Sequence, residues 1–296
     1  MENRELAKFP TLIEQVYLKP KQTPGLARRA VPYQIARSSL FTAQPANLKN
    51  RKGFSSDGTL EAYSKFTIAQ TSGRQLVQDE GTVWLELLHL ALKTTDDGSD
   101  QPILVEFAKS GLLKALDWKI DSNNRRRLDS ILERLVDATV SIVQNDQSSW
   151  SASLLIAAGK SRQSARSKSI FFIDRKIVRS FLGGYTLLNR EQRHNLRHKP
   201  LAQWMHAFYS THKSPTPLKG SLIKRLSGCQ TQKADVWIKK LTEALKALAI
   251  VTGWNCSYNY NYDIVHINRG LEDLDATKKA KPAATPYVRA PIDHNI

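Results

Sequence analysis

The chain has 296 residues and a formal net charge of +17, from 44 lysines and arginines against 27 acidic residues. This length allows two hydrophobic cores of modest size, and this charge predicts a polyanionic partner. The two cysteines are too few for a disulfide framework and lack metal-ligand spacing. No apolar run suits a membrane span or a signal peptide. Together these features predict a cytoplasmic protein without membrane contact.

Residues 1–60 have the composition of a flexible arm. Prolines at positions 10, 20, 24, 32 and 45 interrupt any regular period, and ten basic residues stand against four acidic ones. This composition favours a solvated basic leader over an independent binding element. After the arm, Tyr63, Phe66 and Ile68 alternate with polar residues, which predicts a strand.

A first folded domain is predicted over residues 61–175. Apolar residues at helical spacing indicate helices at 83–92 and 108–117, with a short strand at 103–105 between them. A third helix over 123–140 follows the N-cap candidates of segment 121–124. Strand patterns then occur at 140–142, 150–156 and 170–173.

The third helix is apolar on one face and basic on the other. Its apolar positions are Leu128, Ile131, Leu132, Leu135, Val136 and Val140. Its start and opposite face carry the predicted DNA-binding residues Asn123, Arg125, Arg126, Arg127, Ser130 and Arg134. Arginine suits this role because its guanidinium makes bidentate hydrogen bonds to guanine. Two alternatives stay open: a solvated basic cap at Arg125–Arg127, and an ion pair of Arg134 with Glu133 or Asp137.

The loop over residues 160–169 carries four positive and no negative charges. Because it lies between two predicted strands, it suggests a hairpin tip where Arg162, Arg166 and Lys168 contact phosphates or the minor groove. A flexible loop without DNA contact explains the composition equally well.

A second domain, predicted over residues 176–269, repeats this order. Helical stripes occur at 201–209, 218–226 and 233–250, and a hairpin is predicted from 251–254 and 258–267 across Asn255–Ser257. Lys233, Lys239 and Lys240 lie off the apolar stripe of the last helix, and we predict that they bind DNA. Lys246 lies near the helix C-terminus, where the helix dipole also favours a cation.

Matching helices recur at about 110 residues, the period of a duplicated domain. A helix that is packed on one face, basic on the other and followed by a hairpin is typical of a winged helix on DNA. We therefore predict an α+β fold of two tandem winged-helix domains, each with three helices and a β-hairpin or small sheet. Residues 270–296 are predicted to be a disordered tail. Tyr258, Tyr260 and Tyr262 suit one face of the second hairpin, and stacking on single-stranded DNA is the less favoured interpretation.

The sequence predicts neither catalysis nor a cofactor. It lacks the GxxxxGK[ST] loop that binds nucleotide phosphates. His194 and His198 have no carboxylate or cysteine close in sequence except Glu191, so a surface helix is favoured over a metal site.

Several short segments follow one another in a fixed order between residue 36 and residue 269. They are Ala36–Thr42, Leu76…Asp79-Glu80…Val83-Trp84, Trp118-x-Ile120, Leu132-x-Arg134-Leu135, Ile173-Asp174…Ile177-Val178…Phe181, Phe208-Tyr209-Ser210-x-His212, Pro217-Leu218-Lys219, Trp237…Leu248 and Asp263-x-Val265-His266. Through these collinear segments the chain resembles the plasmid replication initiators of the TrfA type. Their common order, rather than any one segment, carries the resemblance.

This resemblance implies a tandem winged-helix protein that binds double-stranded DNA at directly repeated sites, or iterons, in a plasmid origin. It further implies opening of an A·T-rich segment, contact with the resulting single-stranded DNA, recruitment of the host initiator and replicative helicase, and homodimers in exchange with DNA-binding monomers. Some relatives bind the sliding clamp through a glutamine-leucine-phenylalanine type motif. The segment Gln15–Pro20 lacks the terminal aromatic pair, which leaves contact with the clamp open.

Two other functions fit the same composition. A winged-helix transcriptional regulator would bind a short operator without melting it, whereas an RNA-binding or nucleoid protein would need only the charge. For the homodimer, the strand region Tyr63–Gln78 is a candidate surface, because an unpaired edge there could extend a partner's sheet.

Overall fold

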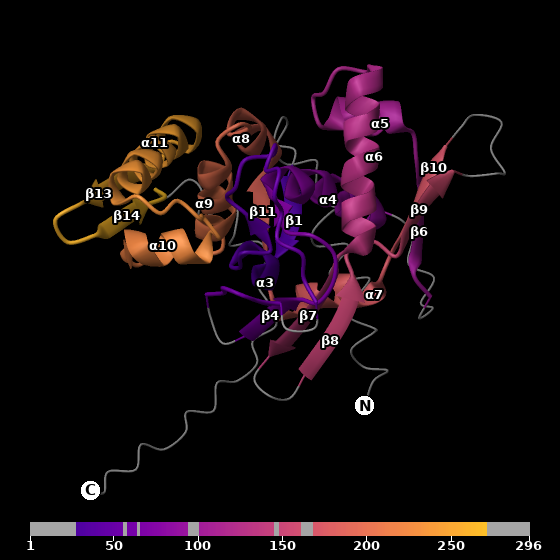
Figure 1. Ribbon diagram of the computed structural model, residues 1–296, viewed down its shortest axis with the longest axis horizontal. Helices are drawn as coiled ribbons and strands as arrows, with labels where there is room; N and C mark the ends of the chain where they lie inside the picture. Colours follow the sequence, from indigo (N-terminus) through magenta and orange to yellow (C-terminus); the bar gives the residue numbers. More distant parts are fainter. Residues whose placement is uncertain are drawn as a thin grey trace, which may run out of the picture.

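The computed structural model describes residues 28–55, 58–63, 66–93, 101–144, 148–160 and 168–270. Helices and strands are mixed along the chain, which confirms the predicted α+β class. Figure 1 shows two groups of helices on opposite sides of a central pair of strands. Among the helices in the described ranges, none has the length and apolar character needed to cross a membrane.

The first part of the chain contains helices α3 (Tyr33–Ala36), α4 (Gln78–Ala91), α5 (Lys109–Ala115) and α6 (Ser122–Asp137). Its strands are β1 (Arg28–Pro32), β2 (Phe41–Thr42), β3 (Thr59–Leu60), β4 (Phe66–Gln70), β5 (Leu76–Val77), β6 (Ile103–Phe107), β7 (Thr139–Gln144), β8 (Ser148–Ser153), β9 (Ala157–Lys160) and β10 (Ser169–Ile173).

The second part begins with α7 (Arg175–Arg179), the 3-10 helix η2 (Ser180–Gly183) and strand β11 (Tyr185–Asn189). Its later elements are α8 (Arg190–Asn195), α9 (Pro200–Ser210), β12 (Leu218–Lys219), α10 (Gly220–Leu226), α11 (Ala234–Thr252), β13 (Asn255–Asn259) and β14 (Ile264–Asn268).

Two regions, which we name the first unit (residues 78–173) and the second unit (residues 200–268), share one connectivity. The first unit runs α4, β6, α5, α6 and later β9 and β10, with β10 hydrogen-bonded between β6 and β9. The second runs α9, β12, α10, α11, β13 and β14, with β14 between β12 and β13. The first unit has an additional hairpin, β7–β8, which joins β3 and β4 in a four-stranded sheet. The order of elements that the sequence predicts to repeat is present in both units.

The two longest helices form where local sequence signals place them. The Asp121 side chain caps α6 by accepting a hydrogen bond of 2.7 Å from the backbone nitrogen of Asn124. α6 ends at Asp137, earlier than predicted, because the chain turns into β7 and buries Val140 there. α11 ends at Gly253, whose φ of 73° lies in the left-handed region that glycine adopts without a steric cost.

The hairpin after α11 is shifted relative to the prediction. Residues 251 and 252 continue the helix, so β13 starts at Asn255 and pairs with β14 from Asn255 opposite Asn268 to Asn259 opposite Ile264. The turn lies at residues 260–263, and the predicted turn across Asn255–Ser257 is wrong.

The buried side chains form two hydrophobic clusters, one around Trp84 of α4 and one around Trp204 of α9. The first cluster extends beyond residue 175 to include Ile177, Val178, Phe181 and Leu188. The predicted domain boundary at 175 is therefore wrong, because α7, η2 and β11 pack on the first core.

Residues 28–55 belong to the fold, so the predicted flexible arm is wrong for this segment. β1 pairs antiparallel with β11, with Arg28 opposite Asn189, and Ala30 and Val31 are buried. Further along, the backbone nitrogen of Ala43 donates to the carbonyl of Ser227 at 2.7 Å. These buried stretches are too short, and too often interrupted by proline, to produce a long apolar period. The segment ties the first core to the second unit.

β4 lies inside its sheet, between β3 and β7. Ile68 is fully buried there. β4 thus has no unpaired edge for a partner's sheet, whereas β5 in the same region pairs with β2 alone among the described strands, so the dimer surface stays a prediction. Within the described residues, β3 and β8 form the edges of this sheet.

Candidate nucleic-acid interface

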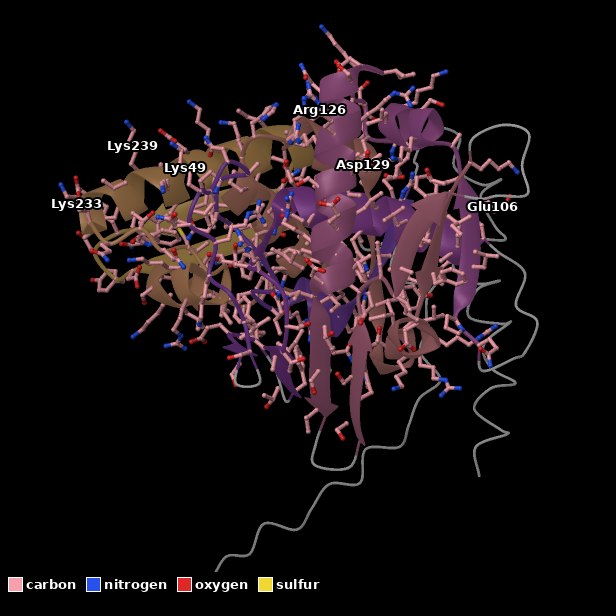
Figure 2. All side chains as sticks on the ribbon, turned by 45° about the vertical axis from the view of Figure 1, so that its right-hand side comes forward. Lys49, Glu106, Arg126, Asp129, Lys233 and Lys239 are labelled. Atoms are coloured by element: carbon pink, nitrogen blue, oxygen red, sulfur yellow. The ribbon has the colours of Figure 1, made fainter. Side chains whose placement is uncertain are left out.

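The first turns of α6 carry a group of exposed arginines. Leu128, Ile131, Leu132 and Leu135 bury the opposite face of the helix, which fixes Arg125 and Arg126 toward solvent. Asn123 Oδ1 accepts a hydrogen bond of 2.7 Å from Arg126 Nη2, so these two predicted residues lie together at the exposed start of the helix. Figure 2 shows Arg126 near the upper end of α6. This end of α6 offers guanidinium donors to an anionic or base-edge partner.

Arg127 is held more closely than its two neighbours. Its guanidinium forms an ion pair with Asp79 at the start of α4 and lies 4.2 Å from the centroid of the Trp118 ring. A partner in contact with Arg127 must therefore compete with a carboxylate and an aromatic face.

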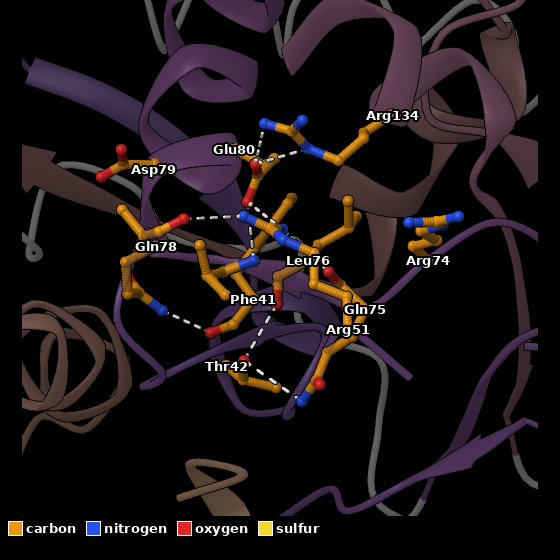
Figure 3. A network of polar contacts seen from close by, with 12 residues as sticks. Phe41, Thr42, Arg51, Arg74, Gln75, Leu76, Gln78, Asp79, Glu80 and Arg134 are labelled. Carbon is orange, nitrogen blue, oxygen red and sulfur yellow. Dashed lines mark hydrogen bonds and ion pairs between the residues drawn. The ribbon is translucent and has the colours of Figure 1, made fainter. Parts of the chain in front are cut away.

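Arg134 takes part in an internal network rather than in the exposed group (Figure 3), and Ser130 is hydrogen-bonded to it. Arg134 Nη2 lies 2.7 Å from Glu80 Oε1, and Arg134 Nη1 donates to Ser130 Oγ at 2.8 Å. The Glu80 side chain is fully buried and also pairs with Arg51 at 3.1 Å. The predicted alternative partners Glu133 and Asp137 are wrong, because the carboxylate comes from α4.

Glu80, whose buried carboxylate holds α6 against α4, has a role that the sequence analysis missed. Besides the two arginines, its Oε2 accepts a hydrogen bond of 2.8 Å from the backbone nitrogen of Val77 at the start of α4. A buried carboxylate in two ion pairs and a cap fixes the position of α6 relative to α4. Glu80 is the third residue of α4, and a glutamate at this position is a sequence signal for such a cap.

The hairpin β9–β10 presents Lys168 at its described end. Lys168 Nζ lies 2.9 Å from Glu106 Oε2 on the neighbouring strand β6, and both side chains are exposed. Arg162 and Arg166 lie outside the described residues.

The basic residues of α11 are exposed along a helix whose other face is buried. Lys233 precedes the first helical residue, Lys239 lies two turns later, and Lys240 Nζ donates to Thr231 Oγ1 at 2.7 Å. Trp237 is buried, as predicted for a core residue, and the Nζ of Lys224 lies 6.0 Å from its ring centroid. In contrast to Arg127 and Arg134 of α6, Lys233 and Lys239 have no ion pair among the described residues.

The turn of the β13–β14 hairpin exposes two aromatic side chains. Tyr260 and Tyr262 are 69% and 74% exposed, whereas the turn itself is fixed by Asp263. Asp263 has a left-handed φ of 54°, and its carboxylate accepts hydrogen bonds of 3.0 Å from both the Ser221 backbone nitrogen and the Tyr258 hydroxyl. Burial alone would raise the pKa of Asp263, but these hydrogen bonds lower it overall. The turn is therefore a rigid support for two exposed tyrosines.

The predicted residues of the two helices lie toward the same side of the molecule. In Figure 2, Arg126 and Lys239 both extend from the upper edge, and the exposed Lys49 is labelled between them.

The described residues contain no group of three or more potential metal ligands. His194 instead lies 2.9 Å from Asp117 Oδ2, and burial, followed by the positive charge of Arg197, lowers its pKa. His194 lies on α8, as predicted, whereas His198 lies in the turn after this helix with a left-handed φ of 70°, so the predicted helix is wrong for His198.

Comparison with known proteins gives both sequence and structural relatives. A family model described as TrfA protein matches residues 18–269. The plasmid replication initiator protein TrfA of Escherichia coli is 25% identical over 248 residues, which are 81% of this chain and 62% of that protein. The chain thus spans less than two thirds of the length of this curated relative.

Among solved structures, a crystal structure of domain 2 and domain 3 of RctB has a TM-score of 0.50 and 13% identity. The match covers 80% of this chain and 97% of that chain. At this identity the likeness concerns the fold alone.

Proposed function

Because this chain belongs to the TrfA family, whose model covers residues 18–269, we propose that it is a plasmid replication initiator that binds directly repeated iteron sites in an origin. The name of the Escherichia coli relative, a plasmid replication initiator, supports the general activity. The net charge of +17 supports a nucleic-acid partner.

The two units are proposed to be tandem winged-helix domains. The observation that carries this proposal is their shared connectivity. In each unit a long helix that is exposed on its basic face precedes a hairpin, and the last strand of that hairpin pairs with the strand that follows the first helix of the unit. In this assignment α6 and α11 are the recognition helices, and the hairpins β9–β10 and β13–β14 are the wings. The match to a structure of two RctB domains supports a two-domain arrangement.

Each unit has a different proposed role on DNA. Asn123, Arg125 and Arg126 at the start of α6 would read base edges in the major groove, where each bidentate arginine–guanine pair contributes roughly 1–3 kcal/mol of discrimination. Lys233, Lys239 and Lys240 would neutralise phosphates and fix the register. Arg162, Arg166 and Lys168 are proposed as phosphate contacts at the first wing.

Opening of an A·T-rich segment is proposed to follow from binding and bending of the duplex, without catalysis or a cofactor. The host initiator, the replicative helicase and the exposed single strand are the proposed partners, with contact to the sliding clamp left open. The monomer is proposed to bind iterons in exchange with a homodimer.

The test is selection of fragments that the full chain binds from random and plasmid DNA, followed by footprinting of the selected fragments. Protection of evenly spaced direct repeats beside an A·T-rich segment would support initiation at an origin. A single short palindrome would favour a transcriptional regulator, and the absence of sequence preference would contradict both functions. A variant with Arg125→Gln and Arg126→Gln should lose the footprint, whereas Lys213→Gln, an exposed lysine outside α11, should keep it.

A further inference from the structure

A cleft of about 240 Å³ separates the first unit from the segment α8–α9 that precedes the second recognition helix. It is lined on one side by the start of α4 and the α5–α6 loop, and on the other by residues of β11, α8 and the loop after it. Six of its lining residues are lysine or arginine: Arg29, Lys119, Arg127, Arg190, Arg193 and Arg197. The cleft is therefore a concentration of positive charge beside the start of α6.

Carboxylates neutralise only half of these cations. Glu86 lies 2.7 Å from Arg29 and 3.3 Å from Arg190. Asp79 pairs with Arg127. A third acidic residue of the cleft, Asp117, lies against His194. Lys119, Arg193 and Arg197 have no ion pair with any described residue.

Arg193 is the unusual member of this group, because it is 95% buried yet makes no direct ion pair among the described residues, and the carboxylates of Asp79 and Glu86 act on it only at longer range. Its Nη2 donates to the neutral Gln78 Oε1 at 3.0 Å and its Nη1 to the carbonyl of Gln203 at 3.4 Å. Its Nε has no hydrogen-bond partner within the described part of the chain. Burial lowers the pKa of Arg193 to about 10, which still leaves the guanidinium charged at neutral pH. A buried guanidinium with an unsatisfied N–H and no carboxylate in direct contact is costly, so an arginine held in this way at a cleft indicates an anionic ligand.

We infer that this cleft binds a phosphate group, with Arg193 as its buried contact and the exposed Arg197 and Lys119 at its mouth. Phosphate fits because its oxygens accept several charged hydrogen bonds at once, and the planar guanidinium matches their spacing. The ligand goes beyond the proposed function, because inorganic phosphate needs no DNA to bind. Two sources share this chemistry: the backbone of a duplex that passes the start of α6, and a free phosphate compound.

The test uses thermal unfolding of the full chain in pyrophosphate and in chloride at matched ionic strength. A ligand at a hundredfold excess over its Kd should raise Tm by roughly 5 °C for a protein of this size. We expect this rise in the unaltered chain and in Arg225→Gln, a control that removes an exposed arginine away from the cleft. The rise should be lost in Arg193→Gln and reduced in Arg197→Gln and Lys119→Gln.

The exposed positions 197 and 119 keep the test valid if Arg193→Gln fails to fold. A rise in Tm that is no larger than in chloride, or that is equal in Arg197→Gln, Lys119→Gln and Arg225→Gln, would overturn the inference.

A second measurement distinguishes the two sources of phosphate. If pyrophosphate weakens duplex binding at constant ionic strength in the unaltered chain but not in Arg197→Gln, the cleft receives a backbone phosphate. If pyrophosphate raises Tm without changing duplex affinity, the ligand is a free phosphate compound. Both results support the site. Loss of sequence-selective DNA binding with an intact pyrophosphate response would contradict the proposed function and leave the site in place.

Discussion

The helices α6 and α11 occupy equivalent places in two units of the same connectivity, yet their basic residues are held differently. α6 carries arginines, two of which are fixed by carboxylates of α4: Arg127 by Asp79 and Arg134 by the buried Glu80. α11 carries lysines whose ammonium groups extend into solvent without an ion pair among the described residues. A guanidinium suits the reading of base edges because it donates two parallel hydrogen bonds in a fixed geometry, whereas an ammonium is a point charge that suits phosphates at variable positions. The comparison suggests that the first unit supplies selectivity and the second supplies affinity.

The largest effect is expected on the free energy of unfolding when Glu80, the buried carboxylate that pairs with Arg134 of α6, is replaced. Glu80→Gln removes the charge that holds Arg134 and Arg51, and the loss of one partner of a buried ion pair costs about 3–5 kcal/mol. Urea unfolding should therefore show a much lower free energy of unfolding. Glu133→Gln, which changes an exposed carboxylate of the same helix, should change it by less than about 0.5 kcal/mol. Equal free energies of unfolding for the two variants would show that the ion pairs of Glu80 do not stabilise the fold.

The next effect tests selectivity at the start of α6. Arg126→Gln should reduce discrimination between selected and random duplexes by roughly ten- to a hundredfold, since a bidentate contact contributes about 1–3 kcal/mol. Arg127→Gln should reduce it less, because Arg127 already contacts Asp79 and Trp118. Titration of both duplexes by fluorescence anisotropy measures the difference. A loss of affinity that is equal on both duplexes would remove Arg126 from base reading.

A smaller effect is expected from α11. The double variant Lys233→Gln with Lys239→Gln should make the salt dependence of log Kd shallower by about 1.8, at about 0.9 for each lost phosphate contact. The change should be the same on selected and random DNA. Lys213→Gln provides the control for loss of a positive charge elsewhere in the second unit. A change confined to selected DNA would assign base reading to α11 and contradict the proposed division of roles between the two helices.

The last effect concerns stability in acid and should be shared by the two units. Burial, and then the charge of Arg29, lowers the pKa of His89 to about 3, and burial, and then Arg37, lowers that of His212 to about 4. Each histidine lies at the C-terminal end of the first helix of its unit. Between pH 6.5 and 4 the unfolded chain binds more protons than the folded one, so stability is full above pH 6.5 and falls as pH decreases.

Urea unfolding midpoints between pH 7 and pH 4.5 measure this loss of stability. His89→Asn and His212→Asn should each flatten the decline by a similar amount. A flattening by only one variant would show that the ends of α4 and α9 differ in their acid response.

Local signals were sufficient to predict α6 and α11. An aspartate cap and a one-sided apolar stripe act within a few residues, so the sequence displays them directly. The exposed position of Arg125, Arg126, Lys233 and Lys239 follows from the same stripes. The start of α11 was predicted within one residue of its observed position, Ala234.

Long-range contacts could not be predicted in this way. The pairing of Arg134 with Glu80 joins residues 54 positions apart, and nothing near Arg134 indicates this choice over Glu133 or Asp137. β1 has five residues and makes its pair only with β11, so its composition resembles that of a leader. Likewise, the charged cleft combines residues of five separate segments, and Arg193 appeared in the sequence as one more surface cation.

The pairing of β1 with β11 also has a consequence for synthesis of the chain. β1 ends at Pro32 and its partner begins at Tyr185, so the first strand leaves the ribosome long before the strand that completes its sheet. At a translation rate of about 5–20 residues per second, this delay is roughly 8–30 seconds. During that interval α4 and α6 can pack, but the buried face of Ala30 and Val31 lacks its partner strand. Completion of the first core is therefore a late event of translation, and a nascent chain stalled before residue 185 would carry β1 without its partner strand.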